Sequence, residues 1–294
     1  MQNKRRFVAV DVLYIALTVL PILIGIAVKI LTNVPDEGIS ITGAQVYFTL
    51  KLPLWDLPVT ESQLNSLLVT VTVFGLCKYL THGITEKCDT KRQIIAEWIV
   101  ENVNKMVSSN MGDYFKAFPP FIASIIGLSA FSSLLTLFGL YPPTSDINVV
   151  SGWAILVFIL ITYYKMKCGP IHYIKSFGEP VKFLAPLNII SEVATPISMA
   201  FRHYGNILSG SVISVLLASG LAALSNTVFG WLTSFPIFRV GIPAVLSIYF
   251  DVFSGCLQAY IFAMLTMLYV GGAFSVDDYI AKKEKQHKRR KTKC

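Results

Sequence analysis

The sequence predicts an all-α polytopic membrane protein with about six membrane crossings and an amphipathic surface helix. Of its 294 residues, 54% are hydrophobic and only 14% are charged, and the mean hydropathy is +0.60. The net charge of +8 does not indicate nucleic acid as a partner, because the basic residues gather at the two ends of the chain and in alternate loops. That distribution is typical of membrane orientation and predicts both termini on the cytoplasmic side.

Residues 1–63 are predicted to form an N-terminal membrane anchor and an external hairpin. A basic triplet at residues 4–6 precedes an apolar run at 7–30. The run is long for a signal peptide and no clear small-x-small cleavage site follows it, which favours a retained anchor. Residues 31–63 alternate apolar and polar side chains around Gly43, a pattern that predicts a short hairpin on the outer side.

Residues 64–280 are predicted to form the main membrane domain. The remaining crossings are expected at residues 64–80, 118–140, 153–164, 184–223 and 242–274. Residues 94–107 carry Trp98 and Val103 on an apolar side and Glu101 on a polar side, which predicts a helix lying on the inner membrane surface. The basic tail at 281–294 is expected to be solvated and to face the lipid surface.

The fifth predicted crossing carries an arginine, Arg202, close to its centre. A charge at that depth costs roughly 2.5 to 3.5 kcal/mol on insertion scales, so such a residue usually faces protein or water and is functional. Helical spacing from Arg202 places a series of small and polar residues on its side of the helix. They are Ser191, Thr195, Ser198, Asn206 and Ser209. These residues predict a hydrophilic track of about 27 Å, although Ser198 and Ser209 taken singly are equally consistent with close helix packing.

A second polar line lies in the last predicted crossing. Ser247, Asp251, Ser254 and Gln258 follow one another at helical spacing. This polar line predicts that Asp251 lies in the outer half of the membrane and is functional. The alternative is that Asp251 only forms a hydrogen bond to a neighbouring helix. His203 points about 100° away from Arg202 and is expected to be a packed or interfacial histidine.

No pattern for a cofactor or a bound metal occurs in the sequence. The five cysteines show no CxxC pairing or metal-ligand spacing. There is no GxxxxGK[ST] loop and no carboxylate cluster suited to Mg²⁺. We therefore expect neither a cofactor nor nucleotide chemistry in this chain.

Three motifs occur in the order found in a known family. They are PISMAFRHYGN at 196–206 followed by Gly210, LQAYIF at 257–262, and the turn PTSDIN at 143–148. With them, the chain resembles subunit a of the rotary (F-type) ATP synthase in its bacterial form, over roughly residues 59–274. The resemblance implies a long, tilted helical hairpin that faces a rotor ring of small subunits, each with a buried carboxylate. It also implies a multi-pass protein of the bacterial plasma membrane.

The resemblance further implies a non-catalytic stator that holds two aqueous half-channels for protons or sodium ions, with nucleotide chemistry in partner subunits. Its partners would be the c-ring, the peripheral-stalk subunit b and the lipid bilayer. Arg202 matches the family's essential arginine, opposite the ring carboxylate, and Asn206, Asp251 and Gln258 match positions that line the ion path. For the inner half-channel we predict a path along the first half of the arginine helix. It comprises Ser191, Glu192, Thr195 and Ser198.

Two alternatives come from other classes of protein. One is a secondary transporter in which Arg202 binds an anion at the membrane midplane, although the sequence shows no internal repeat or pair of broken helices. The other is an assembly subunit without transport of its own. Association with a ring and a nucleotide-hydrolysing head would separate the stator from both.

Overall fold

The computed structural model describes residues 2–32, 43–51, 56–86, 90–169, 173, 177, 183, 185–228, 245–246, 248–274 and 279. Across these residues the chain is helical apart from one β-hairpin, and six helices are long and apolar enough to cross a membrane. They are α1 (Gln2–Thr32), α2 (Glu61–Thr81), α4 (Pro119–Leu134) with η2 (Leu135–Phe138), α5 (Ile147–Cys168), α7 (Ala185–Val228), and η5 (Ile248–Ser254) continuing into α9 (Gly255–Gly272). The predicted all-α fold with six crossings is confirmed.

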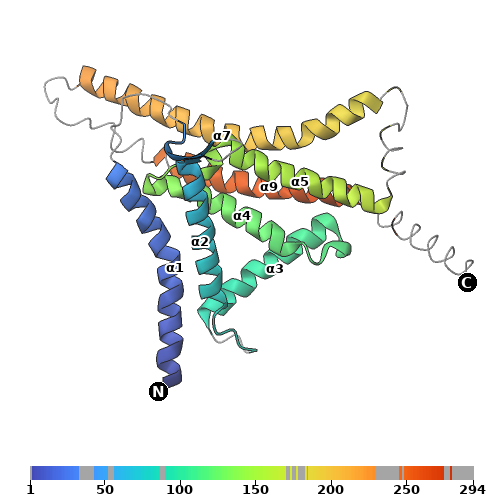
Figure 1. Cartoon of the computed structure of the whole chain (residues 1–294), viewed down its shortest axis with the longest axis horizontal. Helices are drawn as coiled ribbons and strands as arrows, with labels where there is room; N and C mark the ends of the chain where they lie inside the picture. Colours follow the sequence, from blue (N-terminus) through green and yellow to red (C-terminus); the bar gives the residue numbers. More distant parts are fainter. Residues whose placement is uncertain are drawn as a thin grey trace, which may run out of the picture.

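The N-terminal part consists of two upright helices joined through a β-hairpin. Helix α1 packs along α2, and Figure 1 shows both standing steeply to the long helices of the rest of the molecule. Between them β1 (Val46–Lys51) and β2 (Asp56–Thr60) pair antiparallel, with Leu50 opposite Leu57. The hairpin predicted within residues 31–63 is therefore confirmed. Residues 33–42 and the turn at 52–55 lie outside the described residues.

Helix α3 (Lys91–Met111) is the amphipathic helix predicted at residues 94–107. Thr90 caps its first turn by accepting a hydrogen bond from the Gln93 backbone nitrogen. In its second half Val103 and Val107 are buried against the core, whereas Trp98 in its first half is exposed. Among the described helices of this length, α3 alone is absent from the candidate membrane spans. The second half of α3 is therefore packed against the core, and the exposed first half can lie on the membrane surface.

The longest helix is α7, which has 44 residues. At 1.5 Å per residue it is about 66 Å long, more than twice the roughly 30 Å hydrocarbon thickness of a bilayer. A helix of this length stays within a bilayer only when it is strongly tilted. Figure 1 shows α7 along the long axis of the molecule, with α5 and α9 beneath it. The predicted long, tilted helical pair is formed by α7 and the η5–α9 segment, which are in contact.

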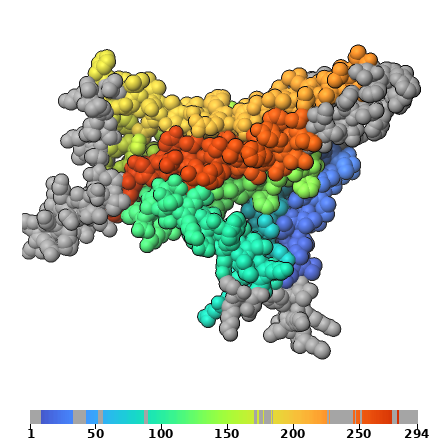
Figure 2. All heavy atoms as spheres, turned by 180° about the vertical axis from the view of Figure 1, so that it is seen from behind, coloured from blue at the N-terminus to red at the C-terminus, as the bar shows by residue number. Residues whose placement is uncertain are grey.

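The outward side of α7 is concave. Both Figure 1 and Figure 2 show its two ends raised away from the other helices and its middle resting on α9. Pro196 lies inside the helix, where it removes one backbone hydrogen bond and favours bending. Surface helices usually curve the other way and are convex toward the outside. The curvature therefore gives α7 an open, hollowed face.

The main core lies beneath α7, where α3, α4, α5 and α9 meet. Its central side chains, which are fully or almost fully buried, are Val107, Ile122, Val157, Phe262 and Met267. Helices α4 and α9 approach closely, since a Cβ placed on Gly255 would lie 2.5 Å from Cβ of Ser133. Such a contact is possible only for glycine, so this core holds α9 close to α4, and α5 and α9 together support α7.

Candidate functional site

The orientation of Arg202 is set by the neighbouring His203. The His203 side chain is 0% exposed, and its Nε2 lies 3.3 Å from Oγ of Ser129 on α4. Its ring also meets Trp153 of α5 and Phe262 of α9 edge-on. These contacts from three helices fix the rotation of α7 about its own axis. The prediction that His203 is a packed histidine is confirmed.

With His203 inward, the neighbouring Arg202 is exposed on the surface of α7. Among the described residues its guanidinium has no ion pair and no hydrogen bond. An arginine stays protonated at any accessible pH. The exposed surface of α7 therefore carries a fixed positive charge that the described part of this chain does not neutralise.

The predicted polar track lies mainly on the same open face. Ser191, Ser198 and Ser209 are exposed, and Thr195 and Asn206 are half-buried. Some of these residues also have the structural role that was the alternative to an ion path. The hydroxyls of Thr195 and Ser209 donate to backbone carbonyl groups of their own helix. No neighbouring helix of the described chain covers Ser198 or Ser209, so packing within this chain does not account for them.

A π-helical turn lies against the second half of this track. Asn206 Nδ2 donates a hydrogen bond to Oγ of Ser254, over 2.9 Å. One turn further on, the position of a Gly210 Cβ would lie 3.5 Å from the Phe250 ring. Segment η5 is a π-helix, a rare conformation that is frequent at functional sites. This turn contains the predicted ion-path residue Asp251.

The other two predicted outer-path residues, Asp251 and Gln258, lie in η5 and α9. The backbone of Asp251 lies in η5, but its side chain is outside the described part of the structure, as is Ser247. Gln258 is 4% exposed and lies on α9, one helical turn beyond Ser254. Half-buried Asn206 and Ser254 thus bond to each other and buried Gln258 follows on α9, whereas Arg202 is exposed.

The first half of α7 borders a polar pocket of about 350 Å³ between α5, α7 and α9. We call it the Glu192 pocket. Its lining includes Ser191, Glu192, Thr195 and Lys165, so the structure brings together three of the four residues predicted for the inner path. Ser198 is not among the lining residues.

Glu192 is held in this pocket by two partners from outside α7. Lys165 Nζ lies 2.9 Å from Glu192 Oε1, and the Tyr173 hydroxyl donates to the same oxygen over 3.0 Å. Burial, together with the hydrogen bond to Glu192, raises the pKa of Tyr173 to about 12. The phenol therefore remains a donor over the whole physiological range.

Sequence reasoning did not find Lys165 or Tyr173 as site residues. Lys165 is one of the basic residues whose distribution predicts the inner side of the membrane. Helical periodicity relates residues within one helix, and these two partners come from α5 and from the connection after it. A lysine in the last turn of an apolar helix, ahead of an acidic residue in the next one, was the available signal.

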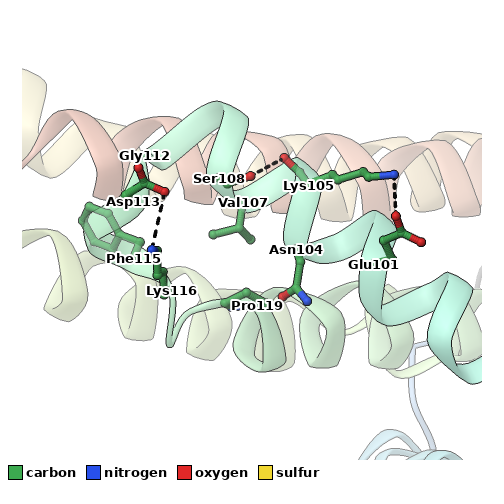
Figure 3. A pocket seen from close by; sticks show the side chains of 10 residues that line it. All are labelled: Glu101, Asn104, Lys105, Val107, Ser108, Gly112, Asp113, Phe115, Lys116 and Pro119. Atoms are coloured by element: carbon green, nitrogen blue, oxygen red, sulfur yellow. Dashed lines mark hydrogen bonds and ion pairs between the residues drawn. The ribbon is translucent and has the colours of Figure 1, made fainter.

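A second polar pocket, of about 380 Å³, lies between α3 and the start of α4. Figure 3 shows Lys105 directed toward Glu101 and Lys116 toward Asp113. The two nitrogen–oxygen distances are 2.7 and 3.9 Å, and all four side chains are mostly exposed. Exposed pairs of this kind contribute little to stability. They contrast with the partly buried pair of Lys165 and Glu192.

The fold and the site together define a class of protein. In this multi-pass membrane protein the longest helix carries an exposed arginine, with polar groups on both sides of it along the helix. That arrangement is typical of an ion-translocating membrane subunit. The comparisons with known proteins give the particular family.

The family model described as ATP synthase A chain matches residues 64–271. ATP synthase subunit a of Priestia megaterium is 33% identical over 237 residues, covering 75% of this chain and 95% of the relative. The same subunit of Listeria welshimeri is 32% identical over 220 residues, covering 70% and 89%. That of Desulforamulus reducens is 35% identical over 183 residues, covering 61% and 66%. The chain belongs to the ATP synthase A chain family, as its motifs indicated.

Proposed function

We propose that this chain is the stator ion-channel subunit in the membrane sector of an F-type ATP synthase, and that it moves protons or sodium ions past a rotating c-ring during ATP synthesis. The observation that carries this proposal is Arg202, which is exposed on α7 and has no ion pair or hydrogen bond among the described residues. Membership in the ATP synthase A chain family supports it. ATP chemistry itself belongs to partner subunits, since this chain is a non-catalytic channel subunit.

The partner that fits the open face of α7 is a convex ring whose buried carboxylates pass Arg202. A hollowed surface accommodates a rounded partner, and a fixed cation attracts a carboxylate and favours release of the ion it carries. The same charge repels a cation that crosses directly from one side to the other. Arg202 is thus the essential gate and the partner of the ring carboxylate, and it does not itself carry the ion.

The contact between Arg202 and the ring carboxylate must be hydrated. A dry ion pair in a low-dielectric medium would be worth many kcal/mol and would stop rotation. The exposure of Arg202 in the free chain supports a partly screened pair. The membrane potential then supplies about 2.3 kcal/mol per elementary charge per 100 mV.

Two half-channels lie on opposite sides of Arg202 along α7 in this proposal. The outer one comprises Asn206, Asp251 and Gln258, with Ser209 beside it, and the hydrogen bond from Asn206 to η5 supports it. The inner one comprises Ser191, Glu192, Thr195 and Ser198, and the Glu192 pocket supports it. Each path ends next to Arg202, so an ion can change channel only by riding on the ring.

The chain is a multi-pass membrane protein of a bacterial ATP synthase. We place both termini on the cytoplasmic side of the plasma membrane, because the basic residues gather in the segments that this orientation puts inside. Residues 1–63 would anchor the chain, 64–280 would translocate ions, and the basic tail at 281–294 would face the lipid surface. Besides the c-ring, subunit b of the peripheral stalk is the expected protein partner.

The test is ATP-driven ion uptake by vesicles that contain the purified complete complex. We expect Arg202→Ala to abolish ATP-driven pumping and to permit passive ion leak through the membrane sector. The sodium dependence of uptake, and its response to a protonophore, identify the transported ion. Full pumping by the Arg202→Ala complex would refute the proposed function.

A further inference from the structure

We propose that Lys165 sets the electrostatic barrier of the Glu192 pocket and that Glu192 acts mainly as its fixed counter-charge, not as an ion carrier. Lys165 then determines which charges enter the inner half-channel, an assignment that rests on the proposed function. The ligand of the pocket is a cation, H⁺ or Na⁺, on its way to or from the ring.

The first support is the geometry of the ion pair. Lys165 Nζ and Glu192 Oε1 are 2.9 Å apart, and the side chains are 31% and 10% exposed. Lys165 Nζ also lies 5.6 Å from the centre of the Tyr173 ring, a cation–π contact. Tyr173 in turn donates its hydroxyl hydrogen to Glu192 Oε1. Each member of this triad contacts both others, which fixes the ammonium at the pocket.

The second support is the location of these charges. Lys165, Glu192 and the neutral residues Ser191 and Thr195 all line the same pocket. An ammonium group there repels an approaching cation unless a negative charge cancels its field. In the described structure the carboxylate of Glu192 is the partner that cancels it. A pocket that is polar but nearly neutral admits cations without trapping them.

This charge-compensation role and an ion-carrying role make opposite predictions for one double variant. If Glu192 carries the ion, every variant without a carboxylate at position 192 is slow. If Glu192 instead neutralises the charge of Lys165, removal of the carboxylate slows ion uptake only while the Lys165 ammonium group is present. Under charge compensation the Glu192→Gln variant should take up ions slowly. The double variant, Glu192→Gln with Lys165→Gln, should recover the uptake rate.

The experiment measures the initial rate of ATP-driven ion uptake into vesicles that contain the complete complex, normalised to the amount of assembled complex. For Glu192→Gln we expect a rate roughly 10- to 30-fold lower. Coulomb's law gives that factor for an uncompensated unit charge about 8 to 12 Å from a cation at an effective dielectric constant of about 20. The double variant should return to within about threefold of the unaltered complex. Tyr173→Phe keeps both charges and should change the rate by less than about fivefold.

The chain offers a matched control in the exposed pair Glu101–Lys105, at 2.7 Å with side chains 64% and 71% exposed. Figure 3 shows this pair on the surface of α3. Glu101→Gln makes the same change of charge but in screened surroundings, so the rate should stay within about twofold. A further variant exchanges the two residues of the partly buried pair, Lys165→Glu with Glu192→Lys. It keeps the pocket neutral and should retain activity, even if Glu192→Gln does not assemble.

Three results would overturn the proposal: a double variant as slow as Glu192→Gln, an unchanged rate for Glu192→Gln, or an inactive exchanged variant that assembles normally. Arg202→Ala in the same vesicles tests the stator function separately. If Arg202→Ala pumps normally, the proposed function fails. If Arg202→Ala is inactive and the double variant is not rescued, only the role of Lys165 fails.

Discussion

Asn206 on α7 donates a hydrogen bond over 2.9 Å to Oγ of Ser254 in the π-helical turn η5. Asn206 lies one helical turn beyond Arg202. Its bond joins the helix that carries the arginine to the segment that contains Asp251. This bond therefore links a polar residue of the arginine helix directly to the π-helical turn. This relationship leads to the first prediction.

Asn206→Ala removes the donor of this bond, and we expect ATP-driven pumping to slow by about two- to tenfold without uncoupling, because a neutral hydrogen bond has a net value of about 0.5–1.5 kcal/mol. Ser254→Ala removes the acceptor and serves as the matched variant. If the two act through their mutual bond, the double variant is no slower than the slower single one. Strictly additive losses would show that the bond is not the reason.

Asp251→Asn replaces a group that can take up and release a cation with one that cannot. We expect ion transport to slow by about 100-fold, the lower end of the range for a positioned proton-transfer group, while ATP hydrolysis stays coupled to the remaining transport. The measurement is the uptake rate as a function of pH, with Asp251→Glu as the variant that keeps the carboxyl group. Transport rates that match the unaltered complex at every pH would rule out a channel role for Asp251.

Gly255→Ala places a methyl group where its carbon would lie 2.5 Å from Cβ of Ser133. The α4–α9 contact must then open, at a cost of about 1–3 kcal/mol typical of overpacking. The measurement is the fraction of complex that survives graded heating in detergent, seen on blue-native gels. We expect this fraction to fall for Gly255→Ala and to recover with Ser133→Gly.

The control for this prediction is Gly152→Ala on α5, where a new Cβ meets nothing within 4 Å. It should leave the heat resistance of the complex unchanged or slightly higher. Equal behaviour of the two alanine variants would mean that the close approach of α4 and α9 does not limit stability.

Asp11→Asn should loosen the N-terminal helix. Asp11 Oδ1 lies 2.9 Å from both Arg92 Nη1 and His82 Nδ1, so it joins α1 to the end of α2 and to the first turn of α3. The hydrogen bond from Arg92 to this carboxylate raises the pKa of Arg92 further above its ordinary value, so no accessible pH removes the arginine's charge.

We expect Asp11→Asn to weaken this junction by about 1.5–3 kcal/mol, the range for hydrogen bonds to charged groups. Faster cleavage of α1 by an added protease, in vesicles that expose the N-terminal side, would reveal it. Asp113→Asn is the control, because Asp113 is 89% exposed and pairs with Lys116 only at 3.9 Å. Equal cleavage rates for the two variants would contradict a role of Asp11 in holding α1.

The sequence by itself determined the elements that depend on local pattern. Apolar runs and the distribution of basic residues predicted six crossings, because each span must satisfy its own backbone hydrogen bonds in lipid. A single mid-span charge identified Arg202, and helical spacing identified its polar track. Alternation of residues predicted the hairpin, and the motifs indicated the ATP synthase family.

Only the tertiary structure decided how these elements face one another. Helical spacing could not show that α7 is a 44-residue helix with a concave outer face, because its length and curvature depend on the helices it rests on. Nor could it show that Lys165 pairs with Glu192 or that Asn206 bonds Ser254. Those contacts join side chains from different helices, and packing of His203 against three neighbours fixes the rotation that brings them together. Local pattern therefore determined which residues are unusual, and packing determined which partner each one has.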